Sequence, residues 1–214
     1  MKVEVKICGL DRIEAVDAAV KHGADFVGFV FYPPSPRNLM PQESLPLIAR
    51  VPENVTRVGL FVDPTDAEIT AMFDGSSLDL IQLHGAETPK RVDEIKQLTG
   101  LPAMKVIKLA GPDDLAAAAA YYDIADRLLF DAKPPADMKN ALPGGNALAF
   151  DWELLRHADI PLPWMLAGGL TSENVQEAVA TSGATAIDVS SGVEDSPGVK
   201  NLKRIEAFLM AAKS

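Results

Sequence analysis

The chain has 214 residues, 48% of them hydrophobic and 23% charged, which is typical of a soluble globular protein with one core. The net charge of -10 and the pI of about 4.7 exclude a general binder of nucleic acid or anionic membranes, because such a binder needs a basic face. The sequence has no apolar run near the roughly 18–20 residues of a membrane helix, and its start has no signal-peptide pattern. We therefore expect a cytoplasmic protein with a single domain, residues 1–214, and neither a nucleic-acid nor a membrane partner.

The cysteine and histidine content limits the disulfides and metal sites that the chain can form. Cys8 is the one cysteine of the chain, so an internal disulfide cannot form, and this suits a reducing compartment. One cysteine and three scattered histidines also cannot build a Cys/His zinc cluster, so we expect no metal site of that kind.

Short apolar runs rich in β-branched residues predict eight β-strands, most of them bounded by Gly, Pro or Asp. In chain order these runs are Val3–Ile7, Phe26–Phe31, Arg57–Val62, Leu78–Leu83, Ala103–Lys108, Arg127–Asp131, Trp164–Ala167 and Ala186–Val189.

Segments with helical spacing of apolar residues lie between the strands. They cover Asp11–His22, Thr65–Phe73, Pro89–Leu98, Ser172–Ser182 and a last helix from about Val199 to Ala212. Thr65 and Thr88 are candidates for N-cap residues, and Gly23 follows the first helix as a C-cap glycine. Strands that alternate with helices imply a parallel sheet, and eight such units in this length favour a closed (β/α)8 TIM barrel over a doubly wound sheet. The sequence also contains no dinucleotide-binding fingerprint and no P-loop.

In such barrels, polar residues at the C-terminal ends of the strands point into the active site. This rule selects the candidates for active-site residues. We expect two long loops on that face, Tyr32–Pro41 and Ala132–Phe150. Long loops in a compact barrel more often carry functional residues than merely connect a strand to a helix. Besides the small residues after the seventh and eighth strands, the candidates are Cys8, Arg37, Asp63, Gln82, His84, Asp131, Lys133 and Asp188.

Cys8 and Asp131 end the first and sixth strands, on roughly opposite sides of a barrel. A thiol, with an ordinary pKa of about 8.5, becomes a base near neutral pH after a modest downward shift. A buried aspartate can keep its proton and act as a general acid. Such a pair suits proton transfer between adjacent carbon and oxygen atoms of a sugar. The alternatives are that Cys8 is a small buried apolar side chain and that Asp131 caps a helix or pairs with Lys133.

Arg37, Gln82, His84 and Asp188 are candidates for binding a substrate. The guanidinium of Arg37 can grip a carboxylate through two hydrogen bonds, unless it is a solvated surface arginine. Gln82 and His84 alternate with apolar residues and therefore face the same side of the fourth strand, while Asp188 faces similarly in the eighth. A core histidine with satisfied hydrogen bonds is the alternative for His84.

The loops after the seventh and eighth strands are rich in small residues, among them Gly168, Gly169, Ser191 and Gly192. Backbone N–H groups in such loops can converge on a phosphate, often with the help of a helix N-terminus. The alternative is that these residues only form tight turns.

Segments spanning nearly the whole chain occur in the order typical of one family. They are Lys6–Leu10, Gly28–Phe31, Ser35–Arg37, Val58–Val62, Gln82–Gly85, Phe130–Lys133, Phe150–Trp152, Leu166–Leu170, Asp188–Glu194 and Pro197–Lys200. A Lys-Ile-Cys-Gly start combined with a Ser-Ser-Gly-Val-Glu end is highly specific. In these segments the chain resembles the phosphoribosylanthranilate isomerases of tryptophan biosynthesis.

The resemblance implies an Amadori rearrangement. The ribose ring of N-(5-phosphoribosyl)anthranilate opens and the C2 proton moves, which gives 1-(2-carboxyphenylamino)-1-deoxyribulose 5-phosphate. The family roles imply that Cys8 is the general base, that Asp131 protonates the ring oxygen, and that Arg37 holds the anthranilate carboxylate. The residues implied around the phosphate are Gly168, Gly169, Ser191 and Gly192. No metal or organic cofactor is implied, because both steps need only proton transfer, and the protein is expected to be a monomer or a homodimer.

One position departs from the family pattern. The family commonly has a glycine where this chain has Ala147, and if that position needs positive φ, the alanine adds strain of about 1 kcal/mol or more. Ala147 is the sole support for one alternative, a catalytically silent barrel that binds a phosphorylated ligand, although pure binding needs neither Cys8 nor Asp131. Another phosphosugar isomerase or epimerase is the second alternative, but a metal-using epimerase needs more histidines at the strand ends than His84 alone.

Overall fold

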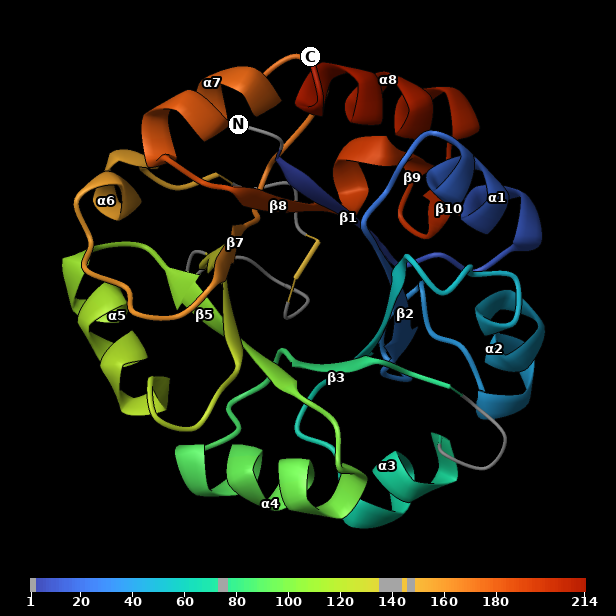
Figure 1. The fold of residues 1–214 in the computed structure, drawn as a ribbon, viewed down its shortest axis with the longest axis horizontal. Coiled ribbons are helices and arrows are strands. Elements are labelled where there is room, and N and C mark those ends of the chain that lie inside the picture. Colours follow the sequence, from blue (N-terminus) through green and yellow to red (C-terminus); the bar gives the residue numbers. More distant parts are fainter. Residues whose placement is uncertain (1–2, 73–76, 135–143, 146–148) are drawn as a thin grey trace.

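Eight parallel strands form a closed barrel in the described part of the chain (Figure 1). The structure is a computed structural model that describes residues 3–72, 77–134, 144–145 and 149–214. Each strand is hydrogen-bonded to the next along the chain, and β8 closes against β1. The strands are β1 (Glu4–Cys8), β2 (Phe26–Phe31), β3 (Thr56–Phe61), β4 (Leu80–Leu83), β5 (Ala103–Leu109), β6 (Arg127–Ala132), β7 (Trp164–Leu166) and β8 (Ala186–Val189). The TIM barrel predicted from the sequence is confirmed, with strand bounds that differ from the predicted ones by at most two residues.

Helices surround the barrel as an outer ring (Figure 1). They are α1 (Ile13–Lys21), α2 (Pro41–Ile48), α3 (Asp66–Met72), α4 (Pro89–Thr99), α5 (Pro112–Ala116), α6 (Glu153–Arg156), α7 (Val175–Ser182) and α8 (Leu202–Ala212). Two short 3-10 helices are η1 (Ala117–Tyr121) and η2 (Ser191–Val193), and a small antiparallel hairpin pairs β9 (Glu194–Ser196) with β10 (Val199–Lys200).

Two predicted N-caps are confirmed. The Thr88 hydroxyl accepts a hydrogen bond from the backbone N–H of Arg91 at the start of α4. The Thr65 hydroxyl accepts one from the backbone N–H of Glu68, whose carboxylate in turn accepts from the backbone N–H of Thr65. Threonine at these positions therefore fixes where both helices begin.

The predicted starts of the last two helices are wrong. Val199–Lys200 forms strand β10 and not helix, and α8 begins only at Leu202, where the Asn201 side chain accepts hydrogen bonds from two backbone N–H groups. Helix α7 begins at Val175 rather than Ser172, because the Asn174 side chain first closes a turn by accepting from the backbone N–H of Thr171. In both places an asparagine side chain determines where the helix begins, and the spacing of apolar residues does not predict this.

Helix α2 was not predicted at all. It contains Pro41 and Pro46, and proline inside a segment argues against a helix because it lacks an N–H donor. Pro41 stands at the first helical position, where that N–H has no partner in any helix. Burial of Leu47 and Ile48 against the barrel outweighs the hydrogen bond lost at Pro46.

The barrel interior is apolar in its lower part and polar at its mouth. Alternate residues of the strands point inward, and the buried apolar layer they form includes Phe26, Val58, Leu80, Met104, Leu129, Met165 and Ala186. Two residues further along these strands, the inward positions include Cys8, Gln82, Asp131 and Asp188. The apolar layer therefore closes the barrel and serves as the floor of a site at the C-terminal strand ends.

Candidate active site

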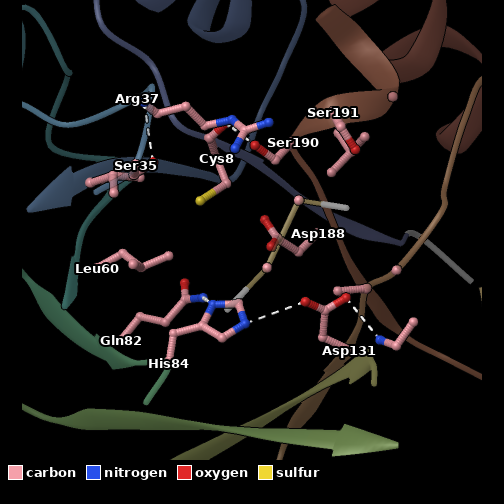
Figure 2. Close-up of a pocket in the computed structure, with 18 of the residues that line it drawn as sticks. Cys8, Ser35, Arg37, Leu60, Gln82, His84, Asp131, Asp188, Ser190 and Ser191 are labelled. Carbon is pink, nitrogen blue, oxygen red and sulfur yellow. Dashed lines mark hydrogen bonds and ion pairs between the residues drawn. The ribbon is translucent and has the colours of Figure 1, made fainter. Parts of the chain in front are cut away.

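A pocket opens at the C-terminal ends of the strands (Figure 2). Its lining includes every residue assigned to catalysis or binding from the sequence: Cys8, Arg37, Gln82, His84, Asp131, Gly168, Gly169, Asp188, Ser191 and Gly192. Asp63 and Lys133 do not line it. Asp63 instead accepts a hydrogen bond from the backbone N–H of Ala86, and Lys133 pairs with Asp114 at 2.6 Å. Lys133 is therefore no partner of Asp131.

Cys8 ends β1 with its thiol in the pocket (Figure 2) and is 4% exposed. Burial raises the pKa of this thiol, and the nearby Lys6 ammonium opposes that rise. The next residue, Gly9, has a φ of 76°, and a Cβ there would lie 2.6 Å from Cδ of Arg37. Glycine at this position therefore both turns the chain and lets the Arg37 side chain reach the pocket. The thiol must lose a proton before it can act as a base.

Asp131 faces Cys8 from the opposite side of the barrel mouth (Figure 2). Its Oδ1 accepts from the backbone N–H of Ala132 at 2.9 Å, and its Oδ2 lies 3.3 Å from Nε2 of His84. The other ring nitrogen, Nδ1, is 3.5 Å from the amide nitrogen of Gln82. Within the described residues, Oε1 of Gln82 and Nε2 of His84 are buried without a hydrogen bond, so this side of the pocket offers polar atoms to a ligand.

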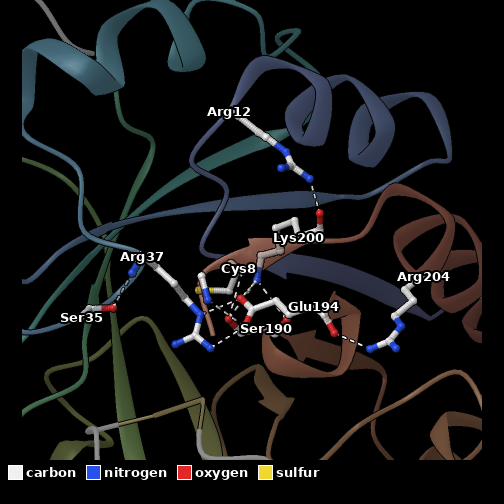
Figure 3. A network of polar contacts seen from close by, with 9 residues as sticks. Cys8, Arg12, Ser35, Arg37, Ser190, Glu194, Lys200 and Arg204 are labelled. Atoms are coloured by element: carbon white, nitrogen blue, oxygen red, sulfur yellow. Dashed lines mark hydrogen bonds and ion pairs between the residues drawn. The ribbon is translucent and has the colours of Figure 1, made fainter. Parts of the chain in front are cut away.

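Arg37 is anchored from below by a buried ion network (Figure 3). Its Nε and Nη2 donate to the two carboxylate oxygens of Glu194, both at 2.7 Å. Lys200 binds Glu194 at 2.5 Å and also donates to the backbone oxygen and the hydroxyl of Ser190. Burial alone raises the pKa of Glu194, but the hydrogen bonds from Arg37 and Lys200 hold that pKa below its ordinary value. The guanidinium is thus fixed, with Nη1 and the second N–H of Nη2 left for a ligand.

Lys6, Glu194 and Lys200 form buried ion pairs beside the pocket that the sequence reasoning did not predict. All three lie in segments that carry the family resemblance, but charged residues at such positions usually face solvent. Lys6 had one usable signal, since it alternates with Cys8 along β1 and therefore faces the same interior. Apart from that resemblance, Glu194 and Lys200 had no usable signal, because the short antiparallel hairpin of β9 and β10 has no periodic pattern.

The loops after β7 and β8 meet at the edge of the pocket. Gly168 and Gly169 have φ values of 89° and 65°, which side chains rarely adopt. A Cβ on Gly192 would lie 1.9 Å from the backbone oxygen of Leu170, so the two loops approach too closely for any other residue there. Backbone and small hydroxyl groups therefore form this end of the pocket, which suits an anion such as a phosphate.

The described part of the loop after β6 lies against His84 and Asp131. A Cβ on Gly144 would lie 2.4 Å from Cε1 of His84 and 3.0 Å from Oδ2 of Asp131. Gly145 has a φ of 75°, and a Cβ there would lie 2.8 Å from Nη1 of Arg37. Ala147, the departure from the family pattern, lies outside the described residues.

Replacing Gly144 with alanine is expected to lower kcat/KM by about 10- to 100-fold, because the new methyl group displaces His84 and with it Asp131. Gly111→Ala is the matched control, since a Cβ on Gly111 meets nothing within 4 Å. Steady-state kinetics of the two variants checks this, and equal activity in both would show that the loop does not position the acid.

The fold and the pocket together define a class of protein. A parallel barrel that holds a thiol and a carboxyl group across its mouth, beside an edge of backbone and small hydroxyl groups, has the architecture of a TIM-barrel enzyme with groups suited to proton transfer. In the described residues no helix is long and apolar enough to cross a membrane, and no three His, Cys, Asp or Glu side chains form a metal-binding group.

Known proteins are similar to this chain along nearly its whole length. The profile of the family described as "PRAI: N-(5'phosphoribosyl)anthranilate (PRA) isomerase" matches residues 5–211. The chain is 55% identical over 213 residues to the N-(5'-phosphoribosyl)anthranilate isomerase of Paramagnetospirillum magneticum, covering 100% of this chain and 98% of that relative.

Solved structures of phosphoribosyl anthranilate isomerases are also similar to this chain. One similar structure is that of monomers generated from the dimeric isomerase of Thermotoga maritima, with a TM-score of 0.84, 34% identity and coverage of 99% of this chain and 98% of that one. Another is a phosphoribosyl anthranilate isomerase in complex with reduced 1-(o-carboxyphenylamino)-1-deoxyribulose 5-phosphate, with a TM-score of 0.84, 33% identity and the same coverage. The chain belongs to the N-(5'-phosphoribosyl)anthranilate isomerase family, the aldose–ketose isomerases of tryptophan biosynthesis, and the resemblance seen in the sequence is confirmed.

Proposed function

We propose that this chain converts N-(5-phosphoribosyl)anthranilate to 1-(2-carboxyphenylamino)-1-deoxyribulose 5-phosphate with Cys8 as general base and Asp131 as general acid. The observation that carries the proposal is the placement of the thiol and the carboxyl group across one pocket, from strands β1 and β6 (Figure 2). A substrate sugar between them presents its ring oxygen to one group and its C2 hydrogen to the other.

The reaction consists of ring opening, removal of the C2 proton and conversion of the resulting enol to a ketone, and each of these steps moves protons. Asp131 donates a proton to the ring oxygen as the bond between that oxygen and C1 breaks, and the anthranilate nitrogen lone pair forms a C1=N double bond. The Cys8 thiolate then removes the C2 proton, and the electron pair of the C–H bond moves toward the positively charged nitrogen. This gives an enol, which becomes the ketone when C1 gains a proton and the C2 hydroxyl loses one; the Cys8 thiol and the Asp131 carboxylate can supply and accept these two protons, which restores both groups. Proton transfer suffices for these steps, so the proposal includes no metal and no organic cofactor.

The two ends of the substrate carry its charges. The free edge of Arg37, formed by Nη1 and Nη2, is proposed to hold the anthranilate carboxylate end-on, because its other edge is occupied by Glu194. Backbone groups around Gly168, Gly169, Ser191 and Gly192 are proposed to hold the phosphate. His84, Gln82 and Asp188 are proposed to contact the ribose between these ends, where Oε1 of Gln82 and Nε2 of His84 offer buried polar atoms.

Arg37→Ala is expected to raise KM about 10- to 100-fold and to change kcat far less, since hydrogen bonds to a charged group contribute about 1.5–3 kcal/mol. Arg37→Lys is the control, because it keeps the charge but lacks the pair of parallel donors. Steady-state kinetics distinguishes the outcomes. An unchanged KM in Arg37→Ala would show that the carboxylate binds elsewhere.

The overall proposal is tested by continuous anthranilate fluorescence, with phosphoribosylanthranilate generated in situ and no metal added. Enzyme-dependent loss of signal, with kcat in the ordinary range of about 1–1,000 per second, supports the proposal. Loss no faster than the spontaneous rate would favour the catalytically silent barrel instead.

We also propose a cytoplasmic enzyme whose partner is its phosphorylated substrate and which binds no nucleic acid and no membrane. The net charge of -10 supports this, since nucleic acids and anionic lipids repel such a surface. A monomer or a homodimer is proposed for the assembly, in line with the dimeric Thermotoga maritima relative. Light scattering after size exclusion decides between the two.

A further inference from the structure

Lys6 occupies an unusual place, because its side chain is fully buried inside the barrel. It precedes Cys8 by two residues on β1 and so points to the same interior, and its register partner on β2 is Phe26 of the apolar layer. Its Nζ binds Oδ1 of Asp188 on the neighbouring strand β8 at 2.9 Å. Burying such an ion pair rarely adds stability over an apolar pair of the same size, so the fold alone does not explain it.

Gly28 on β2 brings the Lys6 ammonium next to the Cys8 thiol. A Cβ on Gly28 would lie 3.0 Å from Sγ of Cys8 and 3.0 Å from Nζ of Lys6. Any side chain at position 28 would therefore enter the space where these two groups meet. The missing side chain leaves a shared space in which Sγ of Cys8 and Nζ of Lys6 lie close together.

Other charges around the thiol act less directly. The titratable and charged groups facing Cys8 are Lys6 on β1, Asp188 on β8, Arg37 after β2 and Lys200 on β10, with the His84 and Asp131 side chains across the pocket (Figure 2). Arg37 and Lys200 both pair with Glu194, which offsets much of their charge (Figure 3). After burial, Lys6 has the largest influence on the pKa of Cys8 and lowers it, whereas the smaller influence of Asp188 raises it.

We propose that Lys6 is the positioning residue of the general base: its ammonium, held in place by Asp188, stabilises the Cys8 thiolate in the otherwise apolar barrel. This inference rests on the proposed role of Cys8. Before reaction the thiolate and the ammonium form a pair, and transfer of the C2 proton to Sγ leaves a neutral thiol beside the unchanged Lys6–Asp188 pair. Lys6 itself exchanges no proton with the substrate.

The test is a titration of Cys8, which is clean because the chain has no other cysteine. The rate of alkylation by iodoacetamide is measured against pH in the free enzyme, and its midpoint reports the thiol. Lys6→Met is expected to move this midpoint upward by at least about one pH unit, the usual effect of losing a neighbouring opposite charge. The rise of kcat/KM with pH is expected to move by the same amount.

Two further variants make the result decisive. Lys6→Met combined with Asp188→Asn leaves no unpaired charge in the barrel, so it folds even if the single variant does not, and its midpoint is also expected above that of the unchanged protein. Lys105→Met removes a buried lysine from a similar pair with Glu87 outside the pocket, and should leave the midpoint unchanged. An unshifted midpoint in a folded variant lacking Lys6 overturns the proposal. If instead the midpoint shifts but Cys8→Ala keeps its activity, the role of Cys8 as base is what fails.

Discussion

Replacement of Cys8 by alanine is expected to lower kcat by about 10²- to 10⁴-fold while the barrel remains folded, because the C2 proton then has no base within reach. The thiol is the one side chain at the end of β1 that faces the pocket and can accept that proton. Its removal leaves a small void that costs about 1 kcal/mol, which a barrel of this size tolerates. The fluorescence assay measures the rate, and circular dichroism with a thermal melt checks the fold.

Cys8→Ser is the matched control for shape. A hydroxyl has nearly the same size as the thiol but a far higher pKa, so the serine variant is expected to be almost as slow as the alanine variant. The unchanged protein adds a pH signature: since burial raises the pKa of the thiol, kcat/KM should increase through neutral and into alkaline pH as the thiolate forms. Near-full kcat in either variant would falsify the assignment of the base.

The fold was predictable because each barrel strand is buried on both faces. Runs such as Phe26–Phe31 and Ala186–Val189 are almost continuously apolar, and the structure begins and ends both strands at these residues. Helix α2 was not predictable, since Pro41 and Pro46 hide a helix that tertiary packing stabilises. The hairpin of β9 and β10 was missed because strands of two or three residues carry no period.

The site was predictable where a residue's place on a strand determines its position. Cys8, Gln82, Asp131 and Asp188 all follow from strand alternation, and the structure gathers them in one pocket. The support beneath them was not predictable. Glu194 reaches Arg37 from 157 residues further along the chain, and no local pattern encodes such a contact. The sequence therefore indicated the groups that can react, while the groups that hold them required the structure.

Replacement of Asp131 by asparagine is expected to lower kcat by about 10²- to 10⁴-fold with little change in KM, because asparagine has no acidic proton to give to the ring oxygen. The amide keeps the size of the carboxyl group, and its oxygen can still accept the hydrogen bond from the backbone N–H of Ala132. The amide also places a polar group of the same size next to Nε2 of His84. Activity should therefore fall through the lost proton and not through a rearranged pocket.

Asp63→Asn provides the matched control for this variant. Asp63 follows β3 of the same barrel and accepts a hydrogen bond from the backbone N–H of Ala86, but it does not line the pocket. We expect the Asp63 variant to keep its kcat and the Asp131 variant to lose it, while both bind the reaction product with ordinary affinity. Full turnover in Asp131→Asn would mean that another group, with His84 the nearest, protonates the ring oxygen. Loss of product binding together with turnover would instead make Asp131 a substrate-binding residue, since an acid that acts only in the transition state leaves ground-state affinity intact.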